Sequence, residues 1–156
     1  WNLWKSRSMI PHVTATEKHY GLIKPEVYAE ELLPSYPEAP IDFKFFCFDG
    51  QAKFSHVDKD RHVEHTRNFY DEQGQFMDIK LTYENFQESI CESDYFEMLD
   101  LANKLSSKVG KRFVRVDLYK EDGKVYFGEF TFVPDAGYGF NVKPESYNKT
   151  LGDFWK

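Results

Sequence analysis

The stretch RFVRVDLYKEDGKVYFGEFTF, residues 112–132, decides the fold, because it has the pattern of two strands joined by a tight turn. Both halves are rich in β-branched and aromatic residues, which favour strands. Residues 121–123, Glu-Asp-Gly, fit a three-residue hairpin loop with glycine in the left-handed position. The stretch therefore predicts an antiparallel hairpin.

This loop predicts the register of the hairpin. It places Arg115 opposite Glu129 and Asp117 opposite Phe127, so that Asp117 and Glu129 are diagonal neighbours within about 8 Å. Thr131 shares their face of the hairpin, while the other face is apolar. The expected apolar residues are Val114, Val116, Leu118, Tyr126, Phe130 and Phe132.

Polar residues in the middle of two strong strands point to a site. Two carboxylates beside an arginine suit a divalent cation that holds phosphate oxygens, since Mg²⁺ prefers one or two carboxylates plus substrate phosphates. The alternative is a solvated face with a surface ion pair between Arg115 and Glu129, worth about 0–1 kcal/mol. The spacing of the residues leaves both interpretations open.

The flanking sequence predicts further strands and one helix. Residues 41–48 followed by Asp-Gly indicate a strand entering a hairpin, with a return strand over 52–58 and an extended segment over 62–69. Residues 71–78 are polar and are typical of a mobile loop. An apolar stripe predicts a helix over 94–108, with Asp94 and Glu97 at capping-box spacing and Gly110 as its C-terminal cap.

Composition excludes several classes of protein. The 156 residues suit one domain, and 41% hydrophobic with 29% charged residues is wrong for a disordered chain. The net charge of −6 argues against a nucleic-acid binder. No apolar run reaches the length of a membrane span. Cys47 and Cys91 are expected to be two free, buried thiols in a reducing cytoplasm, and the alternative is a single disulfide between them.

The aromatic residues and the histidines have their own alternatives. Aromatics make up 18% of the chain and suit either a sugar-binding surface or a core, and residues 45–48 favour the core. His62 and His65 would point to opposite sides of an extended segment, which argues against a shared zinc ion. Paired carboxylates also serve glycoside hydrolysis, but an adjacent arginine suits a cation better.

The sequence resembles the ATP-grasp fold, and specifically its TupA-like (teichuronopeptide biosynthesis) family. The resemblance follows family order over about residues 17–155. It is carried by VYAEELL, IDFKFFCFDG, DKDR, RNFYD, FEMLDLANKLS, FVRVDLYKEDGKVYFGEFTF and LGDFW. It implies an α+β fold, the C-terminal ATP-grasp lobe, with an antiparallel sheet and helices packed on one face.

The resemblance implies a magnesium site on the hairpin. Asp117 and Glu129 match the family's Mg²⁺ ligands. Thr131 stands where an asparagine ligand is common, and a hydroxyl is a weaker ligand. Arg115 matches the arginine that contacts phosphate.

The resemblance also implies an ATP site. Glu30 to Leu33 match the adenine hinge, which favours a strand end there. Asp42 is the candidate for holding the ribose hydroxyls, and Lys44 is a further nucleotide-binding candidate. Two further arginines are expected at the site: Arg67, beside a flap at Phe69-Tyr70-Asp71, and Arg61.

The implied activity is ATP-dependent ligation. A carboxylate, such as that of a uronic acid, would take the γ-phosphate, and an amine would then displace phosphate to give an amide in bacterial surface polysaccharide synthesis. A cytoplasmic bacterial enzyme is expected. Nothing before residue 17 resembles the first ATP-grasp lobe, so residues 1–156 are expected to form a single partial domain. The alternatives are a glycan-binding or glycosyltransferase-associated module without ATP chemistry, and a non-catalytic fragment.

Overall fold

The structure of the chain is a computed structural model, and it describes residues 26–27, 29–33, 35, 37–137 and 142–156. No helix in these described ranges has the length and apolar character needed to cross a bilayer.

The chain divides into two compact units. One comprises Trp1–Leu32 and Val133–Gly139, and within it the structure describes a short 3₁₀ turn, η2 (Pro134–Gly137). The other comprises Leu33–Phe132 and Phe140–Lys156 and holds the sheet.

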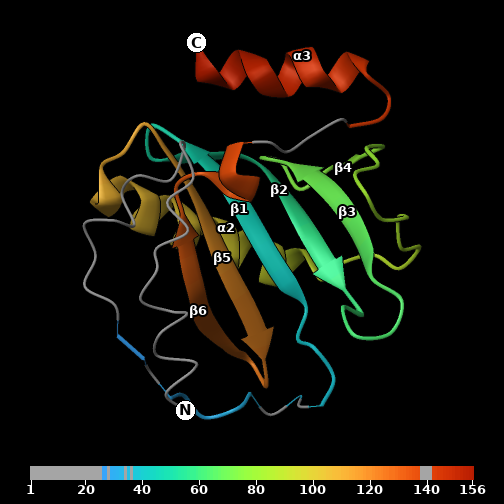
Figure 1. The fold of residues 1–156 in the computed structure, drawn as a ribbon, viewed down its shortest axis with the longest axis vertical. Helices are drawn as coiled ribbons and strands as arrows, with labels where there is room; N and C mark the ends of the chain where they lie inside the picture. Colours follow the sequence, from blue (N-terminus) through green and yellow to red (C-terminus); the bar gives the residue numbers. More distant parts are fainter. Residues whose placement is uncertain (1–25, 28, 34, 36, 138–141) are drawn as a thin grey trace, which may run out of the picture. The chain divides into compact units, whose positions relative to one another are not determined.

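A six-stranded antiparallel sheet forms the frame of the larger unit, in the order β4-β3-β2-β1-β5-β6 (Figure 1). The strands are β1 (Asp42–Phe48), β2 (Gln51–Lys59), β3 (Thr66–Asp71), β4 (Phe76–Met77), β5 (Phe113–Glu121) and β6 (Lys124–Thr131). With the helices described below, this confirms the predicted α+β class.

The first hairpin forms as the sequence predicts. Asp49 and Gly50 link β1 to β2 with φ angles of 49° and 82°, the left-handed conformation of a tight two-residue turn. β1 is the centre of the sheet because it also pairs with β5 along its whole length.

The second hairpin forms, but its predicted register is wrong. Asp122 and Gly123 alone make the turn, with φ angles of 48° and 72°, and Glu121 pairs with Lys124. A bulge then follows between Asp117 and Leu118. As a result Asp117 lies directly opposite Glu129, and Arg115 lies opposite Thr131.

The bulge falls at Gly128 and exchanges the two faces of β6 beyond it. Between the turn and the bulge, Tyr126 pairs with Tyr119 on the polar face of the hairpin. The prediction that Tyr126 lies on the apolar face is therefore wrong. Val125 packs into the core instead. A Cβ on Gly128 would lie 2.8 Å from Cε2 of Tyr119, which explains why the position is glycine.

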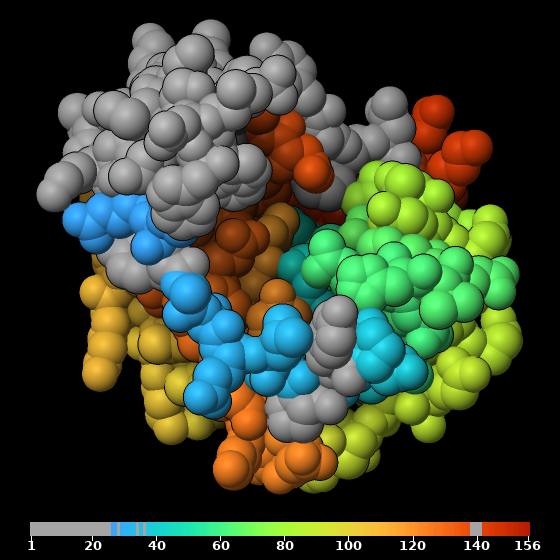
Figure 2. Space-filling model, turned by 60° about the horizontal axis from the view of Figure 1, so that its bottom comes forward, coloured from blue at the N-terminus to red at the C-terminus, as the bar shows by residue number. Residues whose placement is uncertain are grey.

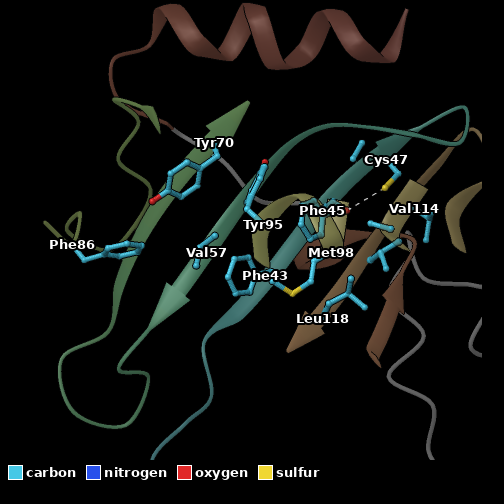
Figure 3. Close-up of a cluster of buried hydrophobic side chains, with 13 residues drawn as sticks. Phe43, Phe45, Cys47, Val57, Tyr70, Phe86, Tyr95, Met98, Val114 and Leu118 are labelled. Carbon is cyan, nitrogen blue, oxygen red and sulfur yellow. Dashed lines mark hydrogen bonds between the residues drawn. The ribbon is translucent and has the colours of Figure 1, made fainter. Parts of the chain in front are cut away.

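One face of the sheet is covered by the helix α2 (Glu92–Val109), whose buried residues join the main core (Figure 3). Met98 and Ala102 of the predicted stripe are fully buried. Tyr95 is equally buried, and its hydroxyl lies 2.9 Å from the Ser55 hydroxyl.

The ends of α2 match the sequence prediction only in part. Gly110 caps the C-terminus with a φ of 63°, as expected. The predicted capping box does not form. The helix α2 begins at Glu92 with Cys91 as its N-cap, so Asp94 lies inside the first turn and not at the cap position. Asp94 and Glu97 instead bind Lys120 of β5.

The other face of the sheet has an aromatic end and a charged end. The aromatic end is a second buried cluster around Phe46, Phe48 and Phe69. Side chains of α3 (Ser146–Gly152) and η3 (Asp153–Trp155) pack against this cluster.

The segment 71–78 holds a hydrogen-bonded turn and the strand β4, so the prediction of a loop throughout is wrong. The carboxylate of Asp71 accepts hydrogen bonds from the backbone N–H groups of Gln73 and Gln75, both at 2.9 Å. The chain then enters β4, which pairs with β3.

Candidate functional site

The charged end of the sheet is built by the alternation of side chains along neighbouring strands. Asp42 and Lys44 stand two residues apart on β1, so both point to the face opposite α2. The register places Asp58 and His56 of β2 beside them on one flank and Asp117 of β5 on the other. Hydrophobic strands thus carry a row of polar side chains at this end alone.

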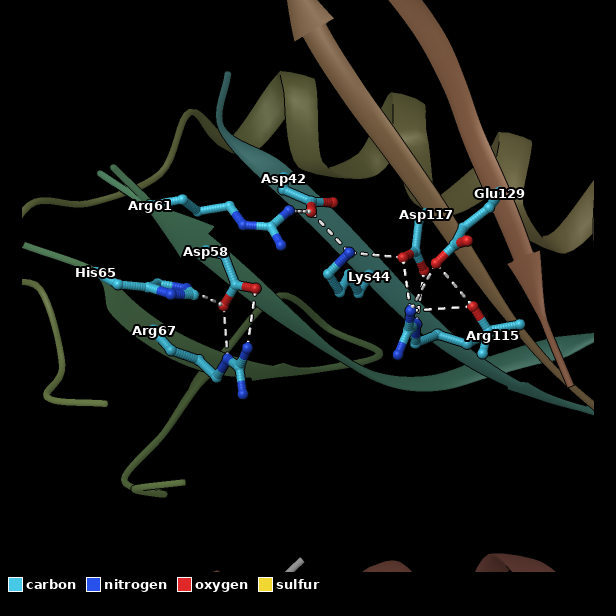
Figure 4. A network of polar contacts seen from close by, with 10 residues as sticks. Asp42, Lys44, Asp58, Arg61, His65, Arg67, Arg115, Asp117 and Glu129 are labelled. Atoms are coloured by element: carbon cyan, nitrogen blue, oxygen red, sulfur yellow. Dashed lines mark hydrogen bonds and ion pairs between the residues drawn. The ribbon is translucent and has the colours of Figure 1, made fainter. Parts of the chain in front are cut away.

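Lys44 lies at the middle of this row (Figure 4). Its Nζ is 2.6 Å from an oxygen of Asp42 and 2.6 Å from an oxygen of Asp117, and all three residues are buried. Burial alone would lower the pKa of Lys44, but the attraction of Asp117 and Asp42 outweighs it and leaves the pKa raised. Lys44 is therefore a fixed positive charge.

Arg115 joins the two carboxylates of the hairpin. Its Nε and Nη2 contact the two oxygens of Asp117 at 2.7 and 2.8 Å, in the bidentate geometry typical of arginine. Nη2 also contacts Glu129 at 3.1 Å and the hydroxyl of Thr131 at 3.0 Å. The predicted polar group of the hairpin is therefore one connected network.

Asp42 has an unbalanced environment. Burial raises the pKa of Asp42, although Lys44 opposes this effect. Arg61 contacts Oδ2 of Asp42 at 2.9 Å, the same oxygen that Lys44 contacts. The other oxygen, Oδ1, is buried without a hydrogen-bond partner. A buried acceptor left open in this way is costly unless a ligand donates to it.

Asp58 forms a second pair on the far flank. Arg67 of β3 grips both its oxygens at 2.5 and 2.9 Å, and His65 lies 3.4 Å away. Burial would raise the pKa of Asp58, but the hydrogen bonds from Arg67 and the neighbouring positive charges lower it to about 2.

The flap predicted at residues 69–71 is wrong. Phe69 and Tyr70 are buried residues of β3, held in the sheet by pairing with β2 and β4. Arg67 therefore extends from a rigid strand, and its guanidinium carbon also lies 4.9 Å from the Tyr83 ring centre.

His56 and Asp58 are site residues that the sequence prediction missed. His56 is buried, its ring lies edge-on to Phe46 and Phe69, and neither ring nitrogen has a hydrogen-bond partner. Burial, with a smaller contribution from Arg67, holds the pKa of His56 well below its usual value. The period of two in 54–58 carries the signal that would have found both residues.

The adenine hinge predicted at Glu30 to Leu33 does not form a strand. Both residues lie in irregular backbone, Glu30 exposed and Leu33 half-buried. Their part in nucleotide binding stays a prediction.

The donor set of the hairpin fits a magnesium ion. Asp117 and Glu129 face each other with hard oxygen donors, Asp117 buried and Glu129 62% exposed toward an incoming ligand. Within the described part of the chain no three His, Cys, Asp or Glu side chains gather as a metal cage.

The polar network contains as many carboxylates as cations, and this balance of charge determines which ligands suit it. Four carboxylates, Asp42, Asp58, Asp117 and Glu129, meet four cations, Lys44, Arg61, Arg67 and Arg115, in ion pairs. Such a row suits a ligand that itself carries both signs, such as a phosphate chain with its metal ion.

Comparison with protein families gives one match. The family model described as TupA-like ATPgrasp matches residues 2–156. The comparisons with curated proteins and with solved structures gave no match.

Proposed function

We propose that this chain, which belongs to the TupA-like ATP-grasp family, is an ATP- and Mg²⁺-dependent carboxylate–amine ligase or the C-terminal part of one. The family suggests a ligase-type enzyme in general terms. The finer proposal is amide formation through an acyl phosphate in the synthesis of a bacterial surface polysaccharide, in the cytoplasm. A uronic acid is the proposed carboxylate substrate.

The observation that carries the proposal is the pair Asp117 and Glu129, joined by Arg115 across the β5–β6 hairpin. A salt bridge with a merely structural role would not need a third charge, yet Lys44 is buried against the same Asp117. Cations that neutralise phosphate charge and carboxylates that hold a metal ion are the groups that phosphoryl-transfer chemistry uses.

Each residue has a role in this proposal. Asp117 and Glu129 would hold the magnesium ion, with Thr131 orienting Glu129 through their 3.0 Å hydrogen bond. Bound there, the ion would neutralise phosphate charge and fix the γ-phosphate for transfer.

The cations would act on the phosphates themselves. Arg115 and Lys44 would stabilise the negative charge that moves from ATP to the substrate carboxylate. Both are held by Asp117, so they are already oriented before substrate binds. Catalysis of this kind rests on positioning and charge and requires no protein nucleophile.

Calorimetric titration of ATP with and without Mg²⁺ tests the site. We expect Asp117→Asn and Glu129→Gln to weaken Mg²⁺-dependent ATP binding by at least about tenfold, because even groups one step removed from a metal contribute about 10–100-fold. Asp100→Asn is the matched control, since Asp100 lies on α2 and pairs only with Lys104 there.

The Glu129→Gln variant keeps the test decisive even where Asp117→Asn fails to fold. Its side chain is exposed, so Glu129→Gln should leave the circular dichroism spectrum unchanged even if Asp117→Asn does not. Wild-type affinity for Mg-ATP in a folded Glu129→Gln variant would contradict the metal assignment. Release of ADP that depends on both a uronic acid and an amine then tests the ligase activity.

A further inference from the structure

A pocket lies on the α2 side of the sheet, on the face opposite the charged network. It has a volume of about 790 Å³, within the range of about 300–1,000 Å³ that is usual for ligand sites. Its walls are β3, the 71–75 turn, β4, residues 85–90 and the first turn of α2. Figure 2 shows the surface of the segments that follow β2, coloured green and yellow-green, on the right of the view.

Carboxamides dominate the polar lining of this pocket. They come from Asn68, Gln73, Gln75, Asn85 and Gln87. The amide nitrogens of Asn68, Asn85 and Gln73 donate to other protein groups. The carboxamides of Gln75 and Gln87 are therefore the ones that offer a ligand both a donor and an acceptor.

Asn68 is a buried residue of this lining, and the protein itself holds its side-chain amide in place. The residue is 3% exposed, and its Nδ2 donates to the carbonyl of Phe86 at 3.0 Å and the hydroxyl of Tyr70 at 3.3 Å. These bonds fix the orientation of the amide. Its Oδ1 is buried and has no hydrogen-bond partner among the described residues, which is costly for an amide oxygen.

Aromatic rings supply the apolar part of the lining. Tyr70, Phe86 and Tyr95 are buried and form its floor, whereas Phe76 is 50% exposed. The Phe76 ring stands edge-on to Tyr70, with centroids 6.2 Å apart, which holds it in place. An exposed, oriented ring at a pocket rim offers a flat surface for the C–H face of a ligand.

The charge of the lining excludes anions. It includes Asp78, Glu88 and Glu92 but no lysine, arginine or histidine. Lys59 lies close by, yet it is held over the Phe86 ring at 4.3 Å and 3.8 Å from Glu88. A phosphate or a uronate would therefore meet net repulsion here.

We propose that this pocket binds a neutral oligosaccharide. Sugar hydroxyls both donate and accept hydrogen bonds, as the carboxamides of Gln75 and Gln87 do. The C–H faces of sugar rings would pack on Phe76. This site goes beyond the proposed ligase activity and does not depend on it, because it uses none of the residues of the charged network.

Titration with defined oligosaccharides tests the proposal. The probes are maltotriose, cellotriose and N,N′-diacetylchitobiose, with trigalacturonic acid as the acidic comparison. We expect at least one neutral probe to bind, and Phe76→Ala and Gln75→Ala each to weaken it by about tenfold, an effect of about 1.4 kcal/mol.

The controls keep the test specific. Phe127→Ala removes a ring with almost the same exposure, 51%, and Gln51→Ala removes an exposed amide, and neither residue lines the pocket. Both should bind like the wild type, as should Glu129→Gln, which separates this site from the ATP site. The proposal is overturned if no neutral probe binds, if trigalacturonic acid binds best, or if Phe76→Ala keeps full affinity.

Discussion

The buried charged side chains on the polar face contact partners of opposite charge, whereas the buried ring of His56 has no such partner among the described residues. Lys44, Asp58 and Asp117 each contact an oppositely charged partner, so their burial is compensated. His56 lies in the same row, between that network and the phenylalanine rings, without any partner for its nitrogens. It is therefore held neutral, and that state makes the stability of the fold depend on pH.

We predict that stability falls as the pH is lowered below about 6.5, the usual pKa of histidine. The unfolded chain binds a proton at that residue, while the folded chain, in which burial and Arg67 lower the pKa of His56, does not. Protonation thus favours unfolding, with a slope of up to about 1.4 kcal/mol per pH unit. Urea denaturation between pH 5 and 8 measures it.

The variant His56→Phe isolates this contribution. Phenylalanine suits the rings of Phe46 and Phe69 and cannot be protonated, so the variant should lose less stability on acidification than the wild type. His62→Phe, at an exposed position, is the matched control and should keep the wild-type slope. Equal slopes in wild type and His56→Phe would refute the assignment.

Among the elements, the β5–β6 hairpin shows how a single bulge positions a site. Without the bulge at Gly128, the two-residue turn would place a different residue of β6 opposite Asp117. The extra residue brings Glu129 to that place while Leu118 keeps its place in the core. The lack of a side chain at Gly128 permits this geometry, because a Cβ there would lie 2.8 Å from the Tyr119 ring.

We predict that Gly128→Ala lowers the free energy of unfolding by about 1–3 kcal/mol, the usual cost of overpacking. The new Cβ would lie 2.8 Å from the Tyr119 ring and 3.1 Å from the backbone oxygen of Asp117, so the ring must move and the backbone at Asp117 must adjust slightly. Mg²⁺-dependent ATP binding should weaken with it, as calorimetry would show.

Gly152→Ala is the control for this variant. A Cβ at Gly152 meets nothing within 4 Å, and its backbone has helical angles, so alanine fits there. Gly152→Ala should be neutral or slightly stabilising, since alanine is the better helix former. An equal loss in both variants would contradict the role given to the bulge.

In the larger unit as a whole, the sheet has a central and a peripheral part. β1 pairs along its length with both β2 and β5 and lies between the two hydrophobic clusters. β4 has two residues and pairs only with β3 among the described strands. Opening of β1 therefore requires the whole sheet to unfold, whereas β4 can open locally.

Hydrogen exchange checks this expectation. The amide hydrogens of Phe45 and Phe46 in β1 should exchange last, with a protection that equals the global free energy of unfolding. Those of Phe76 and Met77 in β4 should exchange several orders of magnitude faster. Exchange of β1 and β4 at one common rate would show instead that the sheet opens only as a unit.

Local patterns in the sequence determined the class of the fold and most of its strands. Asp-Gly at 49–50 and 122–123 supplies the positive φ angles of tight turns, and alternation on β5 separates core residues from polar ones. These signals act over a few neighbouring residues. For that reason the shared face of Arg115, Asp117, Glu129 and Thr131 followed from the sequence. Both cysteines are free, as expected, but only Cys47 is buried, and the expected burial of Cys91 is wrong.

Only the tertiary structure decided which residues meet across strands. The partner of Asp117 depended on a turn one residue shorter than predicted and on a bulge, and strand pairing propagates such a change along the whole hairpin. His56 and Asp58 joined the site because β2 packs beside β1, and the carboxamide pocket formed because α2 lies against β3 and the 71–75 turn. Contacts between segments distant in sequence arise from packing of the whole chain, which no local pattern records.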